Sequence, residues 1–471
     1  MTSDYTSSQT NTFSKLFHQG EGDSNLSKNR LLWEAGSKND IEGRKLIEQD
    51  NQYFIHQSLS TPCLAVAKKV EGIWVEDTAG RRFMDFHGNN AHHIGYAHPK
   101  LAQAIKDQID ELPFAPRRFT DAPAVELAKK ISELAPGDNS KVLFATGGSD
   151  AIDMAMKLAR AATGRHKTIS FWDSFHGAGF GGLAVGGESL FRNNMGPMLS
   201  GSEHVAPFAC YRCPYGYDDN NGAPDLDVCK MTCANMLRYV MEKEKEVAAV
   251  IAEPVRAVPY IPPPGFWKAI REVCNDMGTL LIFDEIPNGL GKTGSMFVSE
   301  QFDVMPDITV IGKALGGGML PIAAMIVRPE LNILSTQALG HYTHEKNPIT
   351  TRAALTTIEI IEEEGLVENA RVVGLHALER LNEMKERHPI IGNVAGLGLC
   401  IGIDLVSNRK DKTPASDIAD RVMYRCLNNG LSFKTTMGNI LTLTPPLIVT
   451  KDQMDQALNI IEEAIIVETS E

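Results

Sequence analysis

Two residues that each follow an apolar run could perform covalent chemistry together. Asp284 ends the run TLLIFD, and Lys313 follows the run ITVIG further along the chain. A lysine amine can form a Schiff base with an aldehyde cofactor, and an aspartate can pair with the pyridinium nitrogen of that cofactor. Lys313 could instead be a solvated lysine at a strand end, but an ammonium beside so much apolar sequence is costly unless it is paired or used. The pair therefore predicts a catalytic site for pyridoxal 5′-phosphate.

Three short apolar runs must position these side chains. They lie between residues 248 and 321 and end at Glu253, at Asp284 and at Lys313. Runs of this length that stop at a charged or glycine-rich turn are typical of buried parallel strands. Ligands of open α/β sheets bind at the carboxyl ends of such strands. We therefore expect the three side chains at one edge of a sheet.

A repeated pattern of strand, turn and helix begins near residue 141 and supplies further candidates. In KVLFATGGSDAIDMAMKLAR, Gly148 and Ser149 lie in the turn before a helix, where backbone amides and a hydroxyl suit a phosphate. Phe175 follows the next strand and could stack on a flat ring. The alternatives are an ordinary helix cap and a packed loop aromatic. The alternation predicts the α/β class, with a mainly parallel sheet covered on both faces.

The length and rhythm of the chain predict two domains built from three segments. A chain of 471 residues that is 43% hydrophobic can bury a large core. We expect residues 1–95 to form an N-terminal arm and a hairpin that belongs to a smaller domain. Residues 96–335 would form a large cofactor-binding domain, and residues 336–471 would complete the smaller one. Residues 1 to about 30 are polar and are expected to be a flexible or partner-dependent arm.

The composition excludes several classes of partner. A formal net charge of -13 argues against binding to nucleic acids or to anionic membranes. The N-terminal residues lack the apolar core of a signal peptide, and no stretch is apolar for long enough to span a bilayer. Eight cysteines in a chain of this length do not form a disulfide scaffold. We therefore expect a cytoplasmic protein.

The ordered motifs TGGSDA, FHG, EPV, GKALGGG and THEKNP make this chain resemble the class III aminotransferases. These belong to the fold-type I pyridoxal-phosphate enzymes, so the resemblance implies a large domain with a mainly parallel sheet and a smaller α+β domain. It also implies that Lys313 carries the cofactor, Asp284 contacts the pyridine nitrogen, Gly148 and Ser149 bind the phosphate, and Phe175 covers the ring.

Two further matches follow from the same resemblance. Glu253 corresponds to a strand-end glutamate of the cofactor site. Thr343 corresponds to a threonine that reaches the phosphate from the neighbouring subunit, which implies a homodimer with shared active sites.

Three departures from the family pattern bear on the reaction. The family's usual glutamine positions are occupied here by Arg256 and Pro287. Transaminases of the family that use 2-oxo acids commonly carry an arginine three residues before the Pro-Pro pair, where this chain has Thr442. A bidentate clamp on a carboxylate needs that arginine. The departures favour a lyase, which needs no amino acceptor, over an ω-amino acid or aminophosphonate transaminase that uses pyruvate or 2-oxoglutarate.

The resemblance is strongest to lyase members that release ammonia from a hydroxylated aminoethylphosphonate, a small anionic amine. Arg117, Arg118 and Arg256 are candidates to bind the phosphonate, and Asn89 and Asn90 to contact its oxygens or the hydroxyl. Each arginine could equally form a structural ion pair. A catalytically silent relative is a further alternative, which the presence of both the lysine and the aspartate disfavours.

Four cysteines have a spacing that is compatible with structural zinc. Cys210, Cys213, Cys229 and Cys233 form the pattern C-x2-C-x15-C-x3-C. Packed free thiols and a redox-sensitive loop are the alternatives. We assign no metal to the active site.

Overall fold

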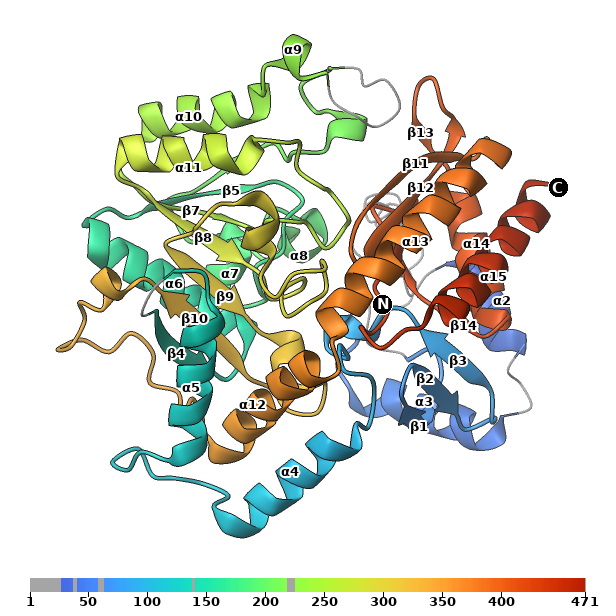
Figure 1. The fold of residues 1–471 in the computed structure, drawn as a ribbon. Coiled ribbons are helices and arrows are strands. Elements are labelled where there is room, and N and C mark those ends of the chain that lie inside the picture. Colours follow the sequence, from blue (N-terminus) through green and yellow to red (C-terminus); the bar gives the residue numbers. More distant parts are fainter. Residues whose placement is uncertain (1–26, 37–39, 58–62, 138–139, 218–224, 471) are drawn as a thin grey trace, which may run out of the picture.

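The computed structural model describes residues 27–36, 40–57, 63–137, 140–217 and 225–470. Its centre is a seven-stranded sheet of order β4-β10-β9-β8-β7-β5-β6 (Figure 1). All neighbours run parallel except β10, which is antiparallel to both β4 and β9. The strands are β4 (Lys141–Ala145), β5 (Lys167–Phe171), β6 (Ser202–Val205), β7 (Val247–Ala252), β8 (Leu280–Asp284), β9 (Ile308–Ile311) and β10 (Ala323–Val327).

The apolar runs form the middle of this sheet. Every residue of β7, β8 and β9 is buried, as expected for strands covered on both faces. One face is covered by α6 (Gly148–Thr163), and the other by α10 (Thr232–Glu244) and α11 (Phe266–Met277) (Figure 1). The strand ends that carry Glu253, Asp284 and Lys313 therefore meet at the carboxyl edge.

Two smaller sheets lie beside the central one (Figure 1). A five-stranded sheet contains β11 (Ile391–Leu397), β12 (Cys400–Asn408), β16 (Ile440–Leu443) and β15 (Lys434–Thr436) in that order, with β13 (Thr413–Pro414) pairing with β12. A four-stranded sheet contains β1 (Ala67–Glu71), β2 (Trp74–Asp77), β3 (Arg82–Asp85) and β14 (Leu431–Ser432). Because β14 pairs in parallel with β3, strands from the N-terminal and the C-terminal parts of the chain share one sheet.

Helices cover the remaining surfaces. Besides α6, α10 and α11, the helices are α2 (Lys28–Gly36), α3 (Ile41–Tyr53), α4 (Pro99–Glu111), α5 (Ala122–Leu134), α7 (Phe180–Val185), α8 (Ser189–Arg192), α9 (Leu226–Cys229), α12 (Pro348–Glu363), α13 (Leu366–Arg387), α14 (Ser416–Asn428) and α15 (Lys451–Thr469). Within the described ranges, every helix is too short or too polar to cross a bilayer. The strands of the central sheet lie between residues 141 and 327, and those of the two smaller sheets lie before residue 95 and after residue 335. The division into domains at residues 95 and 335 stays a prediction.

Left-handed backbone angles separate two pairs of neighbouring elements. Lys230 and Met231 adopt such angles between α9 and α10. The strands β11 and β12 form a hairpin that turns at Gly398, whose φ of +56° suits glycine. The expected N-terminal arm lies mostly outside the described residues.

Candidate active site

The predicted cofactor residues surround one cavity at the carboxyl edge of the central sheet. Its volume is about 190 Å³. The lining residues come from the starts of helices and the loops after strands, and they are Gly148, Ser149, Phe175, His176, Gly177, Glu253, Arg256, Ala257, Asp284, Ile286, Pro287 and Lys313. Six residues named from the sequence for the cofactor therefore lie together: Gly148, Ser149, Phe175, Glu253, Asp284 and Lys313.

One wall of the cavity is the N-terminus of α6. Gly147 caps this helix and contributes no side-chain hydrogen bond, so the first amides of the helix keep their donor capacity for an anion. The Ser149 Oγ accepts a 3.2 Å hydrogen bond from the Ala178 amide. Gly177 must be glycine, because its φ is +124° and a Cβ there would lie 2.4 Å from the Ser149 Oγ. This arrangement is suited to a phosphate group.

Asp284 is held rigidly at the end of β8. Its side chain is buried, its Oδ1 accepts a hydrogen bond from the Ile286 amide at 3.1 Å, and its Oδ2 lies 2.8 Å from the Nδ1 of His176. Because an ionised carboxylate only accepts, the proton of this bond belongs to His176. The sequence prediction did not assign this role to His176. Its position directly after Phe175 in the FHG motif was the available signal.

Lys313 begins the short turn Lys313–Gly316 after β9 and has a φ of +43°. Left-handed backbone is uncommon for a residue with a long side chain, and such conformations gather at functional sites. The short turn Gly88–Asn90 packs against this turn. Asn90 is 2% exposed, has a φ of +57°, and its Oδ1 has no hydrogen-bond partner in the described part of the chain. The turn that carries Asn90, a predicted substrate residue, thus contacts the turn that carries Lys313.

Arg256 lines the cavity within a cluster of buried charges. Its Nη1 lies 3.0 Å from the Glu253 Oε1, its Nη2 lies 3.0 Å from the Glu188 Oε2, and its Nε donates to the Asp173 carbonyl oxygen. Glu253 also accepts from the Phe175 amide at 3.1 Å, which ties the loop after β5 to the end of β7. Two carboxylates already balance the charge of Arg256, so its predicted role as phosphonate ligand is not supported by these contacts.

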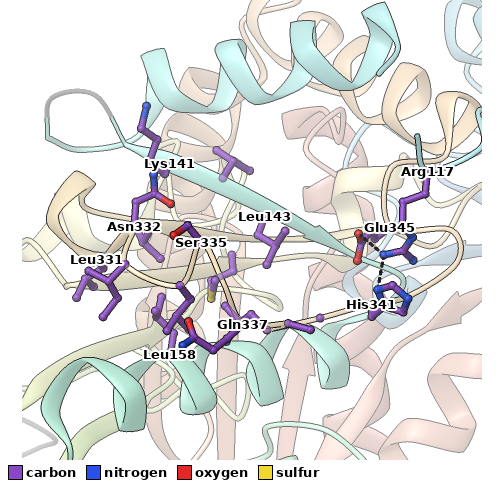
Figure 2. Close-up of a pocket in the computed structure, with 18 residues that line it drawn as sticks. Arg117, Lys141, Leu143, Leu158, Leu331, Asn332, Ser335, Gln337, His341 and Glu345 are labelled. Atoms are coloured by element: carbon purple, nitrogen blue, oxygen red, sulfur yellow. Dashed lines mark hydrogen bonds and ion pairs between the residues drawn. The ribbon is translucent and has the colours of Figure 1, made fainter. Parts of the chain in front are cut away.

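The other predicted arginines lie outside the cavity. Arg117 borders a separate pocket of about 450 Å³, where it binds Glu345 and His341 (Figure 2). It also donates to the Tyr342 carbonyl oxygen. Arg118 is exposed, and so is Thr343, which does not line the cofactor cavity of its own chain. Asn89 borders a third pocket next to the turn at Lys313.

Two buried ionisable residues, Glu285 and Lys292, had no assignment from the sequence. Glu285 accepts hydrogen bonds from the amides of Val298 and Ser299, yet its burial raises the pKa of its carboxyl to about 7. Lys292 donates to the carbonyl oxygens of Thr444 and Pro445. Burial lowers the pKa of Lys292 to about 7.

Thr442 occupies the position at which the family's transaminases commonly carry an arginine. It is fully buried on β16, and its Oγ1 is 2.7 Å from the Oγ1 of Thr436. The hydroxyl is therefore satisfied within the protein.

The four spaced cysteines form no disulfides and line a small pocket of about 30 Å³. Among the described residues, no group of three or more His, Cys, Asp or Glu side chains could hold a metal ion. Burial raises the pKa of the Cys233 thiol to about 11, which disfavours the thiolate that zinc requires. The prediction of structural zinc is not supported.

The cavity fits pyridoxal 5′-phosphate. Gly148 and Ser149 offer amides to its phosphate, Phe175 borders the space for its ring, Asp284 presents an oriented carboxylate to its nitrogen, and Lys313 supplies the amine that reacts with its aldehyde.

Comparisons with known proteins agree with this site. The family model described as aminotransferase class-III matches residues 55–465. The (R)-1-hydroxy-2-aminoethylphosphonate ammonia-lyase of Vibrio splendidus (strain 12B01) is 44% identical over 95% of this chain and 95% of its own length. The leucine/methionine racemase of Thermococcus litoralis is 37% identical over 89% of this chain and 95% of its own.

Solved structures show the same fold. An amine transaminase from an uncultivated Pseudomonas species, in its PLP-bound form, matches with a TM-score of 0.81 and 29% identity, covering 88% of this chain and 98% of that one. The predictions of the fold-type I architecture and of the cofactor are confirmed. The chain belongs to the class III aminotransferase family of pyridoxal-phosphate enzymes.

Proposed function

We propose that this protein is an ammonia-lyase of phosphonate catabolism that converts (R)-1-hydroxy-2-aminoethylphosphonate into phosphonoacetaldehyde and ammonia. The observation that carries the proposal is the 44% identity to the Vibrio lyase over 95% of both chains. The buried Thr442 supports it, because a threonine bonded to Thr436 cannot clamp the carboxylate of an amino acceptor.

The reaction needs a proton removed from the carbon that bears nitrogen and a hydroxide lost from the neighbouring carbon. Pyridoxal phosphate, when bound, withdraws electrons from the carbon next to the substrate's nitrogen. The Lys313 amine takes the proton from that carbon. The departing hydroxide leaves as water, and a water molecule then hydrolyses the unsaturated amine to aldehyde and ammonia, so the net change is the loss of ammonia.

Several side chains of this chain prepare that step. Asp284, oriented by His176 and the Ile286 amide, presents its side chain at the end of β8. Lys313 lines the cavity and has a left-handed backbone conformation, which supports its role as the reacting amine. The unpaired Oδ1 of Asn90 is available to accept a hydrogen bond from the substrate's hydroxyl.

The assembly we propose is a homodimer with shared sites, acting in the cytoplasm. Thr343 is exposed and stands apart from the cavity of its own chain, as expected for a residue that serves a second copy. None of the described cysteines forms a disulfide, which fits a reducing compartment.

Ammonia release from the hydroxylated aminophosphonate tests the proposal. The purified protein should release ammonia and aldehyde in equal amounts, and Lys313→Ala should abolish both while Lys268→Met, an exposed lysine paired with Asp303, should not. A protein that releases no ammonia but exchanges amino groups with pyruvate would be the transaminase alternative.

A further inference from the structure

A phosphonate substrate needs a cation that the cavity lining does not obviously supply. The substrate's acid group carries up to two negative charges, and the lining already includes Glu253 and Asp284. Arg256 is balanced by two carboxylates, and Lys292 is fully buried and donates to two carbonyl oxygens. Another cation must therefore approach from outside the central sheet.

Lys434 on β15 is such a cation. Lysine side chains are almost never this deeply buried, yet Lys434 is only 9% exposed. In the five-stranded sheet it lies directly opposite Thr442, which in turn lies opposite Gly402. Residues opposite one another in a sheet project from the same face, so Lys434, Thr442 and Gly402 share one face.

That face is turned toward the loop that carries the cavity residues. A Cβ on Gly402 would lie 3.1 Å from Pro259, which follows Glu253 and Arg256 in the loop after β7. Cys400 lies two residues before Gly402 on the same face and packs with Val255 of that loop. The face that carries Lys434 thus packs against the loop after β7, which begins at Glu253.

Electrostatic contacts agree with this placement. Burial raises the pKa of the Cys400 thiol to about 12, and the charges that act on it after burial are, in order, those of Lys292, Glu253 and Lys434. The ammonium of Lys434 and the carboxylate of Glu253 are therefore both within electrostatic reach of a single buried thiol.

A second path leads from Lys434 to the catalytic lysine. The Phe86 amide donates to the Ser432 carbonyl oxygen at 2.7 Å, so the chain leaving β14 toward Lys434 runs beside the chain leaving β3. The latter continues into Gly88–Asn90, which packs on the turn that begins at Lys313. Lys434 therefore follows a segment that runs beside the one leading to Asn90 and the turn at Lys313.

We propose that Lys434 binds the acid group of the substrate and thereby selects amines that carry a phosphonate over neutral amines. An ammonium is a compact charge with three donors, which suits the oxygens of a tetrahedral phosphonate. The identification of the acid group as a phosphonate rests on the proposed function, whereas the role of Lys434 in binding an acid group does not.

Binding of three small amines tests this role. Ethylamine, β-alanine and 2-aminoethylphosphonate would be titrated against the visible absorbance of the holoenzyme, for the natural chain, for Lys434→Met, Lys434→Gln and Lys434→Arg, and for Lys268→Met as the control. Thermal stabilisation by ethylphosphonate, which has no amine, gives a second readout. Cofactor content and melting temperature identify variants that fail to fold, and the glutamine variant provides a second uncharged side chain.

We expect Lys434→Met and Lys434→Gln to bind the phosphonate amine roughly ten- to a hundredfold more weakly, since a charged hydrogen bond is lost. Binding of ethylamine should be unchanged, and Lys434→Arg should recover part of the loss. Equal weakening of all three amines, or no weakening, would overturn the inference. If the natural chain prefers β-alanine and releases no ammonia, the proposed lyase fails, while selective loss of acid binding in the variants would still uphold Lys434.

Discussion

Replacing Arg256 by methionine should destabilise the protein far more than it weakens substrate binding. Arg256 is 4% exposed, and it neutralises Glu188 and Glu253, which are each 3% exposed. Its removal leaves two buried carboxylates without their counter-charge. Breaking a buried pair in this way typically costs about 3–5 kcal/mol. Arg256→Met should therefore lower the free energy of unfolding by about that amount.

Urea denaturation of the holoenzyme, followed by circular dichroism, measures this loss. Arg238→Met is a matched control, because Arg238 pairs with Asp276 on the surface and its removal should cost less than about 1 kcal/mol. Adding Glu188→Gln to Arg256→Met should restore part of the lost stability, since the two residues are in direct contact. If Arg256→Met keeps nearly full stability and instead raises the KM for the phosphonate, then Arg256 is a substrate ligand and our reasoning is wrong.

Three further predictions concern the walls of the cavity. His176→Ala should weaken cofactor binding roughly ten- to a hundredfold through loss of the bond to Asp284, whereas His176→Asn, which keeps a donor, should lose less; equilibrium dialysis of the cofactor measures both. Gly177→Ala should impair cofactor binding, because its Cβ would meet Ser149. Gly179→Ala should be tolerated, because its Cβ would come no closer than 3.9 Å to its neighbours. Similar cofactor retention in both variants would contradict the phosphate site at Ser149 and Gly177. The Glu285 carboxyl has a pKa of about 7 in the folded protein, against an ordinary value of 4.5. Between these two pH values the folded protein binds more protons than the unfolded chain. Its free energy of unfolding therefore falls as the pH rises, by at most about 1.4 kcal/mol per pH unit. Glu285→Gln should lack this slope when urea denaturation is compared at pH 5 and pH 7, and parallel curves for both proteins would refute the assignment.

The sequence allowed the strand ends to be predicted, but not the contacts made between loops. Glu253, Asp284 and Lys313 could be placed at one sheet edge because each ends or follows an apolar run, and a run of buried residues is a local signal. The bond between His176 and Asp284 joins residues 108 positions apart, and that between Glu188 and Arg256 joins residues 68 positions apart. No periodicity records such pairings, because tertiary packing decides them.

The same distinction explains the arginines and the lysine. Arg256 has the residue type of an anion ligand, but two carboxylates from different loops surround it. Lys434 has no motif around it, and its importance emerges from strand register, which places it opposite Thr442 and Gly402 on one face. Register depends on the whole sheet and is not fixed by three residues of local sequence.

The parallel pairing of β3 with β14 has a consequence for biosynthesis. The hydrogen bond from the Thr444 amide to the Phe86 carbonyl oxygen, close to that pairing, spans 358 positions of the chain. On a ribosome that makes the chain from its N-terminus, the strands of the central sheet emerge long before β14 is made. The edge of β3 that pairs with β14 therefore stays exposed until nearly the whole polypeptide has been translated. A nascent chain stalled before residue 431 should engage chaperones at that edge, and release should coincide with the emergence of β14 from the ribosome.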